Sequence, residues 1–238
     1  MKQCLITTGT IISDLPLPEG EDSEVRRLQY LDVLWYYREK LPDYPIYFLE
    51  NSLYDYTGDK EFQNLFDLGI TLIKMPLLAD KKAEGKGYRE FNMIDHFVRT
   101  HPEYDSFIKC TGRYKFHNIT DLLKSKLPEN GLLIDTYRRN KWCVTNLFAC
   151  TYNFYNLYLM GIYKEVNDTN HQAIERRIWK KIVYNNLWDN VRMFDISPEY
   201  TIPFSDRNHF EAWRVAMNIG TDIERTVMKA VGQEQIIL

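Results

Sequence analysis

Short apolar segments alternate with amphipathic segments along the first half of this chain, and this alternation constrains the fold more than any other feature. Strands are predicted over 3–8, 46–49, 71–74 and 106–110, and helices over 23–40, 60–68 and 88–100. A β-α-β-α-β-α-β order needs crossover connections, which place successive strands parallel in one sheet. We therefore predict an α/β fold with a mostly parallel central sheet flanked by helices.

The second half of the chain has a different pattern. A helix is predicted over 118–126, a strand over 132–136, an aromatic-rich helical segment over 147–163, an amphipathic helix over 171–188 and a last helix from 211 onward. No repeat or linker interrupts the 238 residues, a length that one hydrophobic core can serve. We predict a single domain over 1–238.

Composition excludes several classes of protein. The net charge of −3 argues against a general nucleic-acid binder, which would carry a basic excess. The four cysteines have no zinc-like spacing and fit reduced thiols. The N-terminus shows no signal-peptide pattern, and the apolar run 146–163 is interrupted by polar residues. We expect a cytoplasmic protein without a membrane-spanning helix.

Polar residues follow the predicted strand over 46–49. Glu50, Asn51 and Ser52 would lie beyond its carboxyl end, where ligands bind in open α/β sheets. A carboxylate there can accept hydrogen bonds from a base or from ribose hydroxyls. The alternative is a glutamate that only caps a loop.

A second candidate site precedes the helix predicted over 88–100. Gly85, Lys86 and Gly87 would offer backbone amides and positive charge to an anion such as a phosphate. Glu90, early in that helix, is expected to complement the helix dipole or to take part in the site. The alternative for this segment is a solvated, lysine-rich turn.

The segment Lys109–Tyr114, KCTGRY, is a sharper cluster. Lys109 stands within an otherwise apolar strand, so its ammonium group needs an anionic partner. Arg113 offers a planar fork for a phosphate or a carboxylate. The alternative is an internal ion pair, with Asp105 or Asp135 as the partner.

Three residues of the second half are candidates for acid–base chemistry. Asp135 ends the strand predicted over 132–136 and could bind a sugar hydroxyl or pair with Arg138 or Arg139. His171 and Glu175 are spaced by one helical turn, so they could form a general base and its orienting partner. Glu175 could equally serve only the helix dipole.

The motifs together resemble GT-A-type nucleotide-sugar glycosyltransferases, and in particular bacterial members that build surface polysaccharides such as capsule and O-antigen (lipopolysaccharide). The resemblance covers about residues 3–185 and rests on IYFLENS, GKGYREFNMIDHF, YDSFIKCTGRYKF and NHQAIERRI. It implies a GT-A-like domain with a nucleotide-binding half over 1–118 and an acceptor-side half over 119–238. It also implies a nucleotide-sugar donor and a glycan or lipid-linked acceptor, so any membrane contact would be peripheral, at the inner face.

The resemblance assigns roles to individual residues. Glu175, Asp135 or His171 would be catalytic, and the donor-binding residues would be Thr8, Glu50, Asn51, Ser52, Lys86, Gly87, Glu90, Lys109, Thr111, Gly112, Arg113 and Tyr114. The family has a metal-binding DxD motif where this chain has Thr111-Gly112-Arg113, which provides no carboxylate pair for Mg²⁺ or Mn²⁺. We therefore expect no cofactor and no divalent metal.

Two other functions are compatible with the sequence. A sugar nucleotidyltransferase would have a glycine-rich signature after the first strand, of which Thr7-Thr8-Gly9-Thr10 is a faint version. The missing DxD motif also fits a non-catalytic protein that binds glycans or nucleotides.

Overall fold

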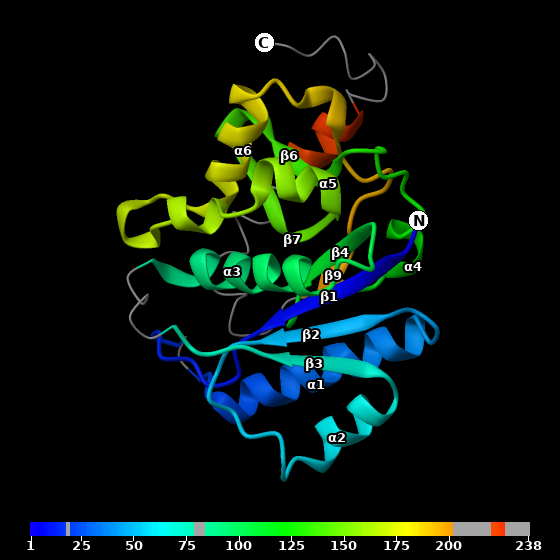
Figure 1. The fold of residues 1–238 in the computed structure, drawn as a ribbon, viewed down its shortest axis with the longest axis vertical. Coiled ribbons are helices and arrows are strands. Elements are labelled where there is room, and N and C mark those ends of the chain that lie inside the picture. The colour runs from blue at the N-terminus through cyan, green and yellow to red at the C-terminus, as the bar shows by residue number, and fades with distance from the viewer. Residues whose placement is uncertain (18–19, 79–83, 202–219, 227–238) are drawn as a thin grey trace.

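The computed structural model describes residues 1–17, 20–78, 84–201 and 220–226 (Figure 1). Its centre is a seven-stranded sheet of order β3-β2-β1-β4-β7-β6-β8. The strands are β1 (Gln3–Gly9), β2 (Ile46–Glu50), β3 (Ile70–Lys74), β4 (Ser106–Thr111), β6 (Leu132–Tyr137), β7 (Trp142–Thr151) and β8 (Val191–Arg192). All neighbouring pairs are parallel except the two made by β7, which runs antiparallel between β4 and β6. The predicted α/β class with a mostly parallel sheet is confirmed.

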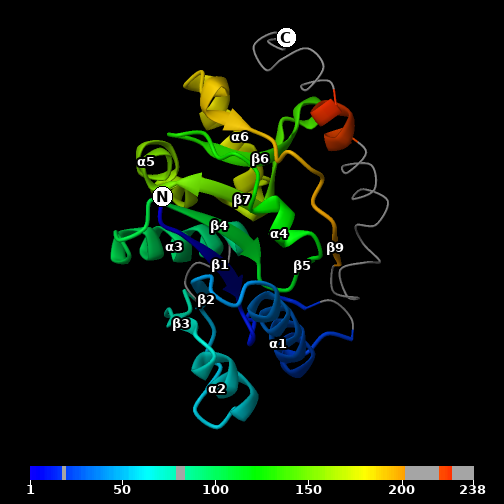
Figure 2. The same cartoon turned by 90° about the vertical axis from the view of Figure 1, so that its right-hand side faces the viewer.

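Helices cover both faces of this sheet. They are α1 (Ser23–Lys40), α2 (Lys60–Asp67), α3 (Gly85–Thr100), α4 (Ile119–Leu122), α5 (Tyr152–Phe154) and α6 (Ile174–Tyr184). Apolar side chains of α1, α2 and α4 form one core with one face of the sheet, and those of α3, α5 and α6 form a second core with the other face. Figure 2 shows α3 and α1 on opposite sides of β1. The two cores fix which polar residues can meet at the edges of the strands.

The long helices of the first half lie close to their predicted positions. Helix α1 spans the predicted residues, but its N-cap is Asp22, whose carboxylate accepts a hydrogen bond from the Val25 amide at 2.8 Å. Helix α3 begins three residues before the predicted start at residue 88. The two glycines of the predicted loop therefore lie in the first helical turn.

The second half departs further from the prediction. Residues 147–151, expected to be helical, complete β7, because their side chains are buried against both cores and pair with β4 and β6. Helical turns follow in α5, in the π-helix η3 (Tyr155–Leu159) and in the 3₁₀ helix η4 (Ile162–Glu165). Helix α4 is shorter than the predicted 118–126, and α6 is shorter at both ends than 171–188. Of the helix expected from 211 onward, residues 220–226 are described and helical.

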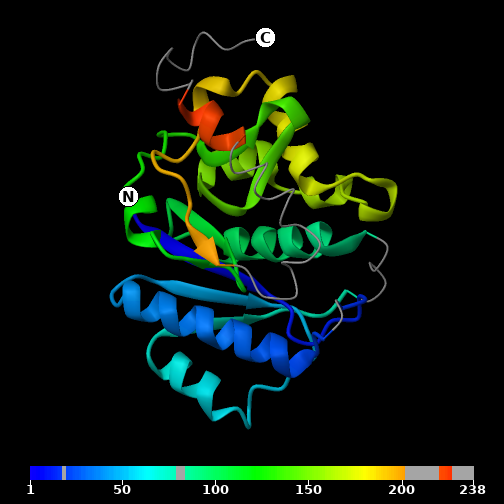
Figure 3. The same ribbon diagram turned by 180° about the vertical axis from the view of Figure 1, so that it is seen from behind.

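A small second sheet pairs β5 (Lys115–Phe116) with β9 (Tyr200–Thr201) in antiparallel register. Figure 3 shows β9 on the same side of the large sheet as α1. This small sheet connects the segment after β8 to the loop that follows β4. None of the helices in the described ranges has both the length and the apolarity to cross a membrane.

Candidate active site

The carboxyl ends of β1, β2 and β4 bring several predicted residues to one edge of the sheet. Thr8 is in register with Thr111, and Gly9 is in register with Glu50. The Gly112 amide donates to the Thr8 carbonyl at 3.0 Å, and a Cβ on Gly112 would stand 2.4 Å from that oxygen. Only glycine therefore allows this close approach of the two strand ends.

Lys109 is the centre of a buried polar network at this edge. Its side chain is 0% exposed, and its Nζ lies 2.7 Å from Glu90 Oε1 of α3. The same nitrogen donates to the Thr145 carbonyl at 2.8 Å and to Thr111 Oγ1 at 3.0 Å. Thr8 Oγ1 donates to Glu90 Oε1 at 2.5 Å. The buried cation thus has the anionic partner that the sequence required, and the partner is Glu90.

Glu175 extends this network from α6. Thr145 Oγ1 donates to Glu175 Oε1 at 2.9 Å, so β7 joins Glu175 to Lys109 through one residue. Burial raises the pKa of Glu175 above its ordinary value, and the nearby carboxylates of Glu90 and Asp168 raise it further. The side chain is half-buried, so a carboxyl group with increased proton affinity stands at the rim of the network.

The predicted pair of His171 and Glu175 is wrong. His171 lies before α6 and ends the 3₁₀ helix η5 (Asp168–Asn170) in left-handed conformation, with φ +56°. Because it is outside the helix, it is not one helical turn from Glu175, and its side chain is exposed. The structure does not bring His171 into the network.

The carboxylate of Asp168 binds to the backbone amides at the start of α3. The Lys86 amide donates to Asp168 Oδ2 at 3.0 Å. Burial raises the pKa of Asp168 above its ordinary value, and hydrogen bonds from the Lys86 and Gly87 amides oppose this shift. Gly85 has φ +86°, and a Cβ there would stand 2.0 Å from Asp168 Oδ2. The amides predicted to face a phosphate are therefore occupied by a carboxylate. The Lys86 side chain is exposed at this helix end.

Arg113 makes an internal ion pair, but not with the predicted partners Asp105 or Asp135. Its Nη1 lies 2.9 Å from Glu21 Oε2 and donates to Gln29 Oε1 at 2.9 Å. Glu21 is buried and also pairs with Arg26 at 2.6 Å. The neighbouring residue, Tyr114, stacks its ring on Tyr200 with centroids 5.5 Å apart. The ion pair of Arg113 with Glu21 therefore connects the loop after β4 to the loop after β1.

Glu50, Asn51 and Ser52 are buried and bonded within the protein. Glu50 Oε1 accepts from the amides of Ile11 and Ser52 at 3.1 and 3.0 Å, and Lys74 Nζ lies 3.2 Å from Oε2. Asn51 Oδ1 accepts from the Thr10 hydroxyl at 2.6 Å, and the Ser52 hydroxyl accepts from the Tyr54 amide. These contacts shape the loop after β1; a role in reading a base stays a prediction.

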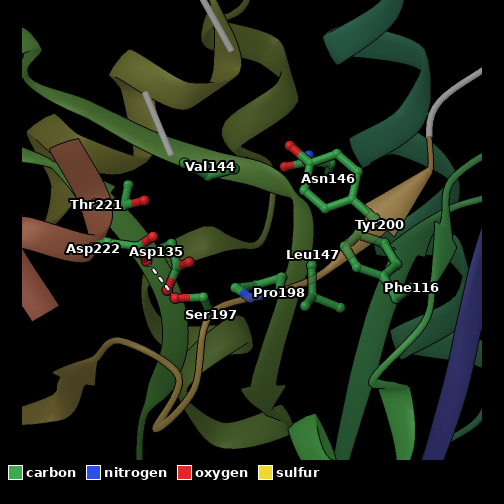
Figure 4. Close-up of a pocket in the computed structure, with 10 residues that line it drawn as sticks. All are labelled: Phe116, Asp135, Val144, Asn146, Leu147, Ser197, Pro198, Tyr200, Thr221 and Asp222. Carbon is green, nitrogen blue, oxygen red and sulfur yellow. Dashed lines mark hydrogen bonds between the residues drawn. The ribbon is translucent and has the colours of Figure 1, made fainter. Parts of the chain in front are cut away.

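Asp135 lies in β6, where its side chain lines a small pocket together with Ser197 and Asp222 (Figure 4). It pairs with Arg225 of the 220–226 helix at 2.5 Å, instead of with Arg138 or Arg139. Burial raises the pKa of this carboxyl group, and the Arg225 guanidinium opposes the shift. The structure does not place Asp135 with the other catalytic candidates.

Sequence reasoning missed four participants, Glu21, Thr145, Asp168 and Arg225, because each is far in sequence from its partner and none lies in a recognisable motif. Within the described part of the chain, no three His, Cys, Asp or Glu side chains gather in a way that could hold a metal ion. Chemically, the edge combines a neutralised lysine, the three hydroxyl groups of Thr8, Thr111 and Thr145, and the two carboxyl groups of Glu90 and Glu175. Such a set can orient a hydroxyl-rich ligand and transfer a proton.

Comparison with known proteins finds similarity in the backbone fold and none in the sequence. The sequence matches no protein-family profile and no curated protein. Among solved structures, a protein from Desulfovibrio desulfuricans G20 described as a nucleotide-diphospho-sugar transferase has 8% identity and a TM-score of 0.48, over 81% of this chain and 79% of its own. The galactosyltransferase LgtC with donor and acceptor sugar analogues has 14% identity and a TM-score of 0.46, over 79% and 72%. A cytidylyltransferase from Leptospira borgpetersenii has 12% identity and a TM-score of 0.44, over 100% and 99%. Similarity at this level carries no information on the reaction.

Proposed function

We propose that the protein is a glycosyltransferase that moves a sugar from a nucleotide-sugar donor to a hydroxyl group of a glycan or lipid-linked acceptor. The observation that carries the proposal is the Thr8–Glu90–Lys109–Thr145–Glu175 network at the carboxyl edge of the parallel strands. This edge is where open α/β sheets bind nucleotides. The motif resemblance supports a donor site at the same edge.

Glu175 is the proposed general base. A half-buried carboxylate with a raised pKa accepts a proton more readily than an ordinary one near neutral pH. In the reaction, the acceptor oxygen gives its proton to Glu175 and bonds to the anomeric carbon. The bond from that carbon to the diphosphate breaks, and the nucleoside diphosphate leaves with the electron pair.

Lys109 and Glu90 are proposed as positioning residues. Because Lys109 is fully buried, it acts through the Thr111 hydroxyl and the Glu90 carboxylate and does not reach a ligand itself. Glu90 keeps 21% of its side chain exposed, so one carboxylate edge can face sugar hydroxyls. This replaces the expectation that Lys109 contacts the donor directly.

We propose further that the transfer needs no divalent metal, since Thr111-Gly112-Arg113 provides no carboxylate pair after β4. The exposed Lys86 side chain is a candidate for the leaving diphosphate. Dialysis against EDTA should leave turnover unchanged. Loss of turnover with EDTA and recovery with Mn²⁺ would show that this part of the proposal is wrong.

The test of the function is release of nucleoside diphosphate from a panel of UDP-, GDP- and dTDP-linked sugars, with mixed glycans as acceptors. Glu175→Gln should lower turnover by about a hundredfold or more, since a general base contributes about 10² to 10⁴. Glu165→Gln, on the neighbouring η4, is the matched control and should keep full activity.

Two results would redirect the proposal. Release of pyrophosphate from a nucleoside triphosphate and a sugar 1-phosphate would identify a nucleotidyltransferase. Absence of any thermal shift with nucleotides and nucleotide sugars at millimolar concentration would favour a non-catalytic protein, because a ligand of the native state raises the apparent stability.

A further inference from the structure

Exposed basic side chains gather on α6 and on the turn that joins β6 to β7. Arg176 and Lys180 lie one helical turn apart on the outward face of α6, and Arg139 and Lys141 lie in the turn. All four are exposed, and none of them forms an ion pair within the described ranges. We call these four residues the cationic patch. It leaves positive charge uncompensated on the surface of a chain whose net charge is −3.

Contacts with tryptophan rings hold the turn beside α6. The Arg176 guanidinium lies 5.8 Å from the ring centre of Trp142, the residue that follows the turn. Arg138, in the turn, lies 4.5 Å from the ring centre of Trp188. Trp188 also contacts Trp179 of α6, with ring centres 5.3 Å apart. The four cations therefore lie on neighbouring elements and form one surface.

The acidic residues of the neighbouring elements do not neutralise this patch. Glu165 of η4 pairs with Lys181 at 2.8 Å, outside the patch. Glu224 accepts a hydrogen bond from the backbone amide of Arg138. Asp189, in the 3₁₀ helix η6 (Trp188–Asn190), is exposed and offsets at most one of the four cations. The patch therefore keeps a surplus of positive charge that an anionic partner could meet.

Two exposed side chains with apolar surface continue the outward face of α6 toward its end. Val183 is 42% exposed and Tyr184 is 79% exposed. They follow Lys180 by three and four residues, so they lie next to it on the helix surface. The headgroup layer of an anionic bilayer accepts both kinds of group, because its phosphates attract cations and its apolar boundary takes up tyrosine and aliphatic side chains. A soluble polyanion offers only the charge.

We propose that the cationic patch, with Val183 and Tyr184, is a docking surface for an anionic lipid bilayer. Clusters of about four or more lysines and arginines on one surface are typical of proteins that bind anionic lipids. Arg176 directly follows Glu175, the proposed general base, so docking would hold the candidate active site close to the headgroups. Of the two acceptor classes, this favours the lipid-linked one. That last step rests on the proposed function, whereas binding to the bilayer does not.

The test is cosedimentation of the full chain with lipid vesicles, without nucleotide. One set of vesicles is phosphatidylcholine with about 30% phosphatidylglycerol, and the other is phosphatidylcholine alone. We expect binding to the anionic vesicles only. Salt at about 0.5 M should release the protein, because it shortens the distance over which charges interact.

The double variant Arg176→Gln/Lys180→Gln should bind anionic vesicles about 25-fold more weakly, since each cation near an anionic surface strengthens binding about fivefold. The matched control, Lys60→Gln/Lys126→Gln, removes the same charge from exposed lysines outside the patch and should bind nearly as well as wild type. Lys60 begins α2, which lies at the opposite end of the molecule from α6 (Figure 1). Circular dichroism would show that each variant folds.

Tyr184→Ser separates a bilayer from a soluble polyanion. It should weaken binding to anionic vesicles and leave binding to polygalacturonate, a soluble acidic glycan, unchanged. The proposal is overturned by equal binding to both kinds of vesicle, by no binding to either, or by equal losses in the two double variants. Unchanged vesicle binding in Tyr184→Ser, or tighter binding to polygalacturonate than to vesicles, would also overturn it. Release of nucleoside diphosphate, measured without vesicles, tests the transferase proposal separately.

Discussion

The interaction of Lys109 with Glu90 allows a quantitative test of how this fold holds its candidate active site. Lys109 Nζ has three partners within 3.0 Å: Glu90 Oε1, the Thr145 carbonyl and Thr111 Oγ1. Lys109→Met fills the same space without the charge, and it leaves the Glu90 carboxylate at the sheet edge without its cation. Glu90→Leu does the reverse and leaves an ammonium group in the interior.

The two changes should not cost the same. Removing one partner of a buried ion pair costs about 3–5 kcal/mol. Glu90 keeps 21% of its side chain exposed and can be hydrated, whereas Lys109 is fully buried. We therefore expect about 3 kcal/mol for Lys109→Met and about 4 kcal/mol or more for Glu90→Leu. Together, the two changes should cost only about 2 kcal/mol, because no charge is then left alone and only hydrogen bonds are lost.

Urea unfolding followed by tryptophan fluorescence measures these free energies, and circular dichroism confirms the fold of each variant. For a domain of this size, 3 kcal/mol corresponds to a drop in Tm of about 9 °C. Lys115→Met is the control, because Lys115 pairs with Asp32 at 2.7 Å on the surface, where such a pair contributes about 1 kcal/mol or less. A cost below about 1 kcal/mol for Lys109→Met, or a double variant less stable than both single ones, would refute the reasoning.

Three further predictions rest on single contacts. Because burial raises the pKa of Glu175, the native state keeps a proton that the unfolded chain loses above its ordinary pKa of 4.5. Glu175→Gln should therefore be more stable than wild type at pH 8 in urea titrations and equal to it at pH 4; a constant difference would contradict this. Gly85→Ala should cost at least about 2 kcal/mol of unfolding free energy, because the φ of +86° strains an alanine and the new Cβ would clash with Asp168. The control is Gly161→Ala, which has a φ of +80° and open space around its Cβ and should cost about 1 kcal/mol. Equal melting temperatures of the two variants would contradict the clash. Arg27 lowers the pKa of Asp59, so the contribution of this carboxylate to stability is complete above its ordinary pKa of 3.8 and is lost as the pH falls from there through the depressed native-state value. Asp59→Asn should cost about 2 kcal/mol at pH 7 and clearly less at pH 2 in the same titrations, and an undiminished cost at pH 2 would contradict the ion pair.

Periodic patterns made most of the first half predictable. The helix over 23–40 and the first four strands are local features, since each is specified by the residues within it and by how their apolar side chains repeat. The segment 147–163 was mispredicted for a physical reason. A strand buried on both faces has no polar alternation, so by periodicity alone it looks like a buried helix.

Partners of buried charges were not predictable in the same way. Burial of Lys109 requires an anion, and burial of Asp135 requires a cation, but the requirement does not name the residue. Arg113 forms an ion pair with Glu21, 92 residues away in the sequence, and Asp135 forms one with Arg225, 90 residues away. Such pairs depend on the placement of whole elements, so the sequence could name candidate residues at the strand ends but could not predict their charged partners.

The first turn of α3 shows what this difference means for ligand binding. The sequence predicts free amides at Gly85, Lys86 and Gly87, but in the structure the amides of Lys86 and Gly87 donate to the Asp168 carboxylate from η5. Asp168→Ala should release these amides together with the positive end of the helix dipole. We expect calorimetry to show about tenfold tighter binding of inorganic pyrophosphate than to wild type.

The matched control is Glu165→Ala, because it removes one negative charge from the adjacent η4 without touching the helix start. If freed amides are the cause, Asp168→Ala should gain affinity and Glu165→Ala should not. An equal gain in both variants would mean that overall charge sets the affinity. No gain in Asp168→Ala would mean that the start of α3 does not receive anions even when its amides are open, and the diphosphate would then have to bind elsewhere along the edge formed by β1 and β4.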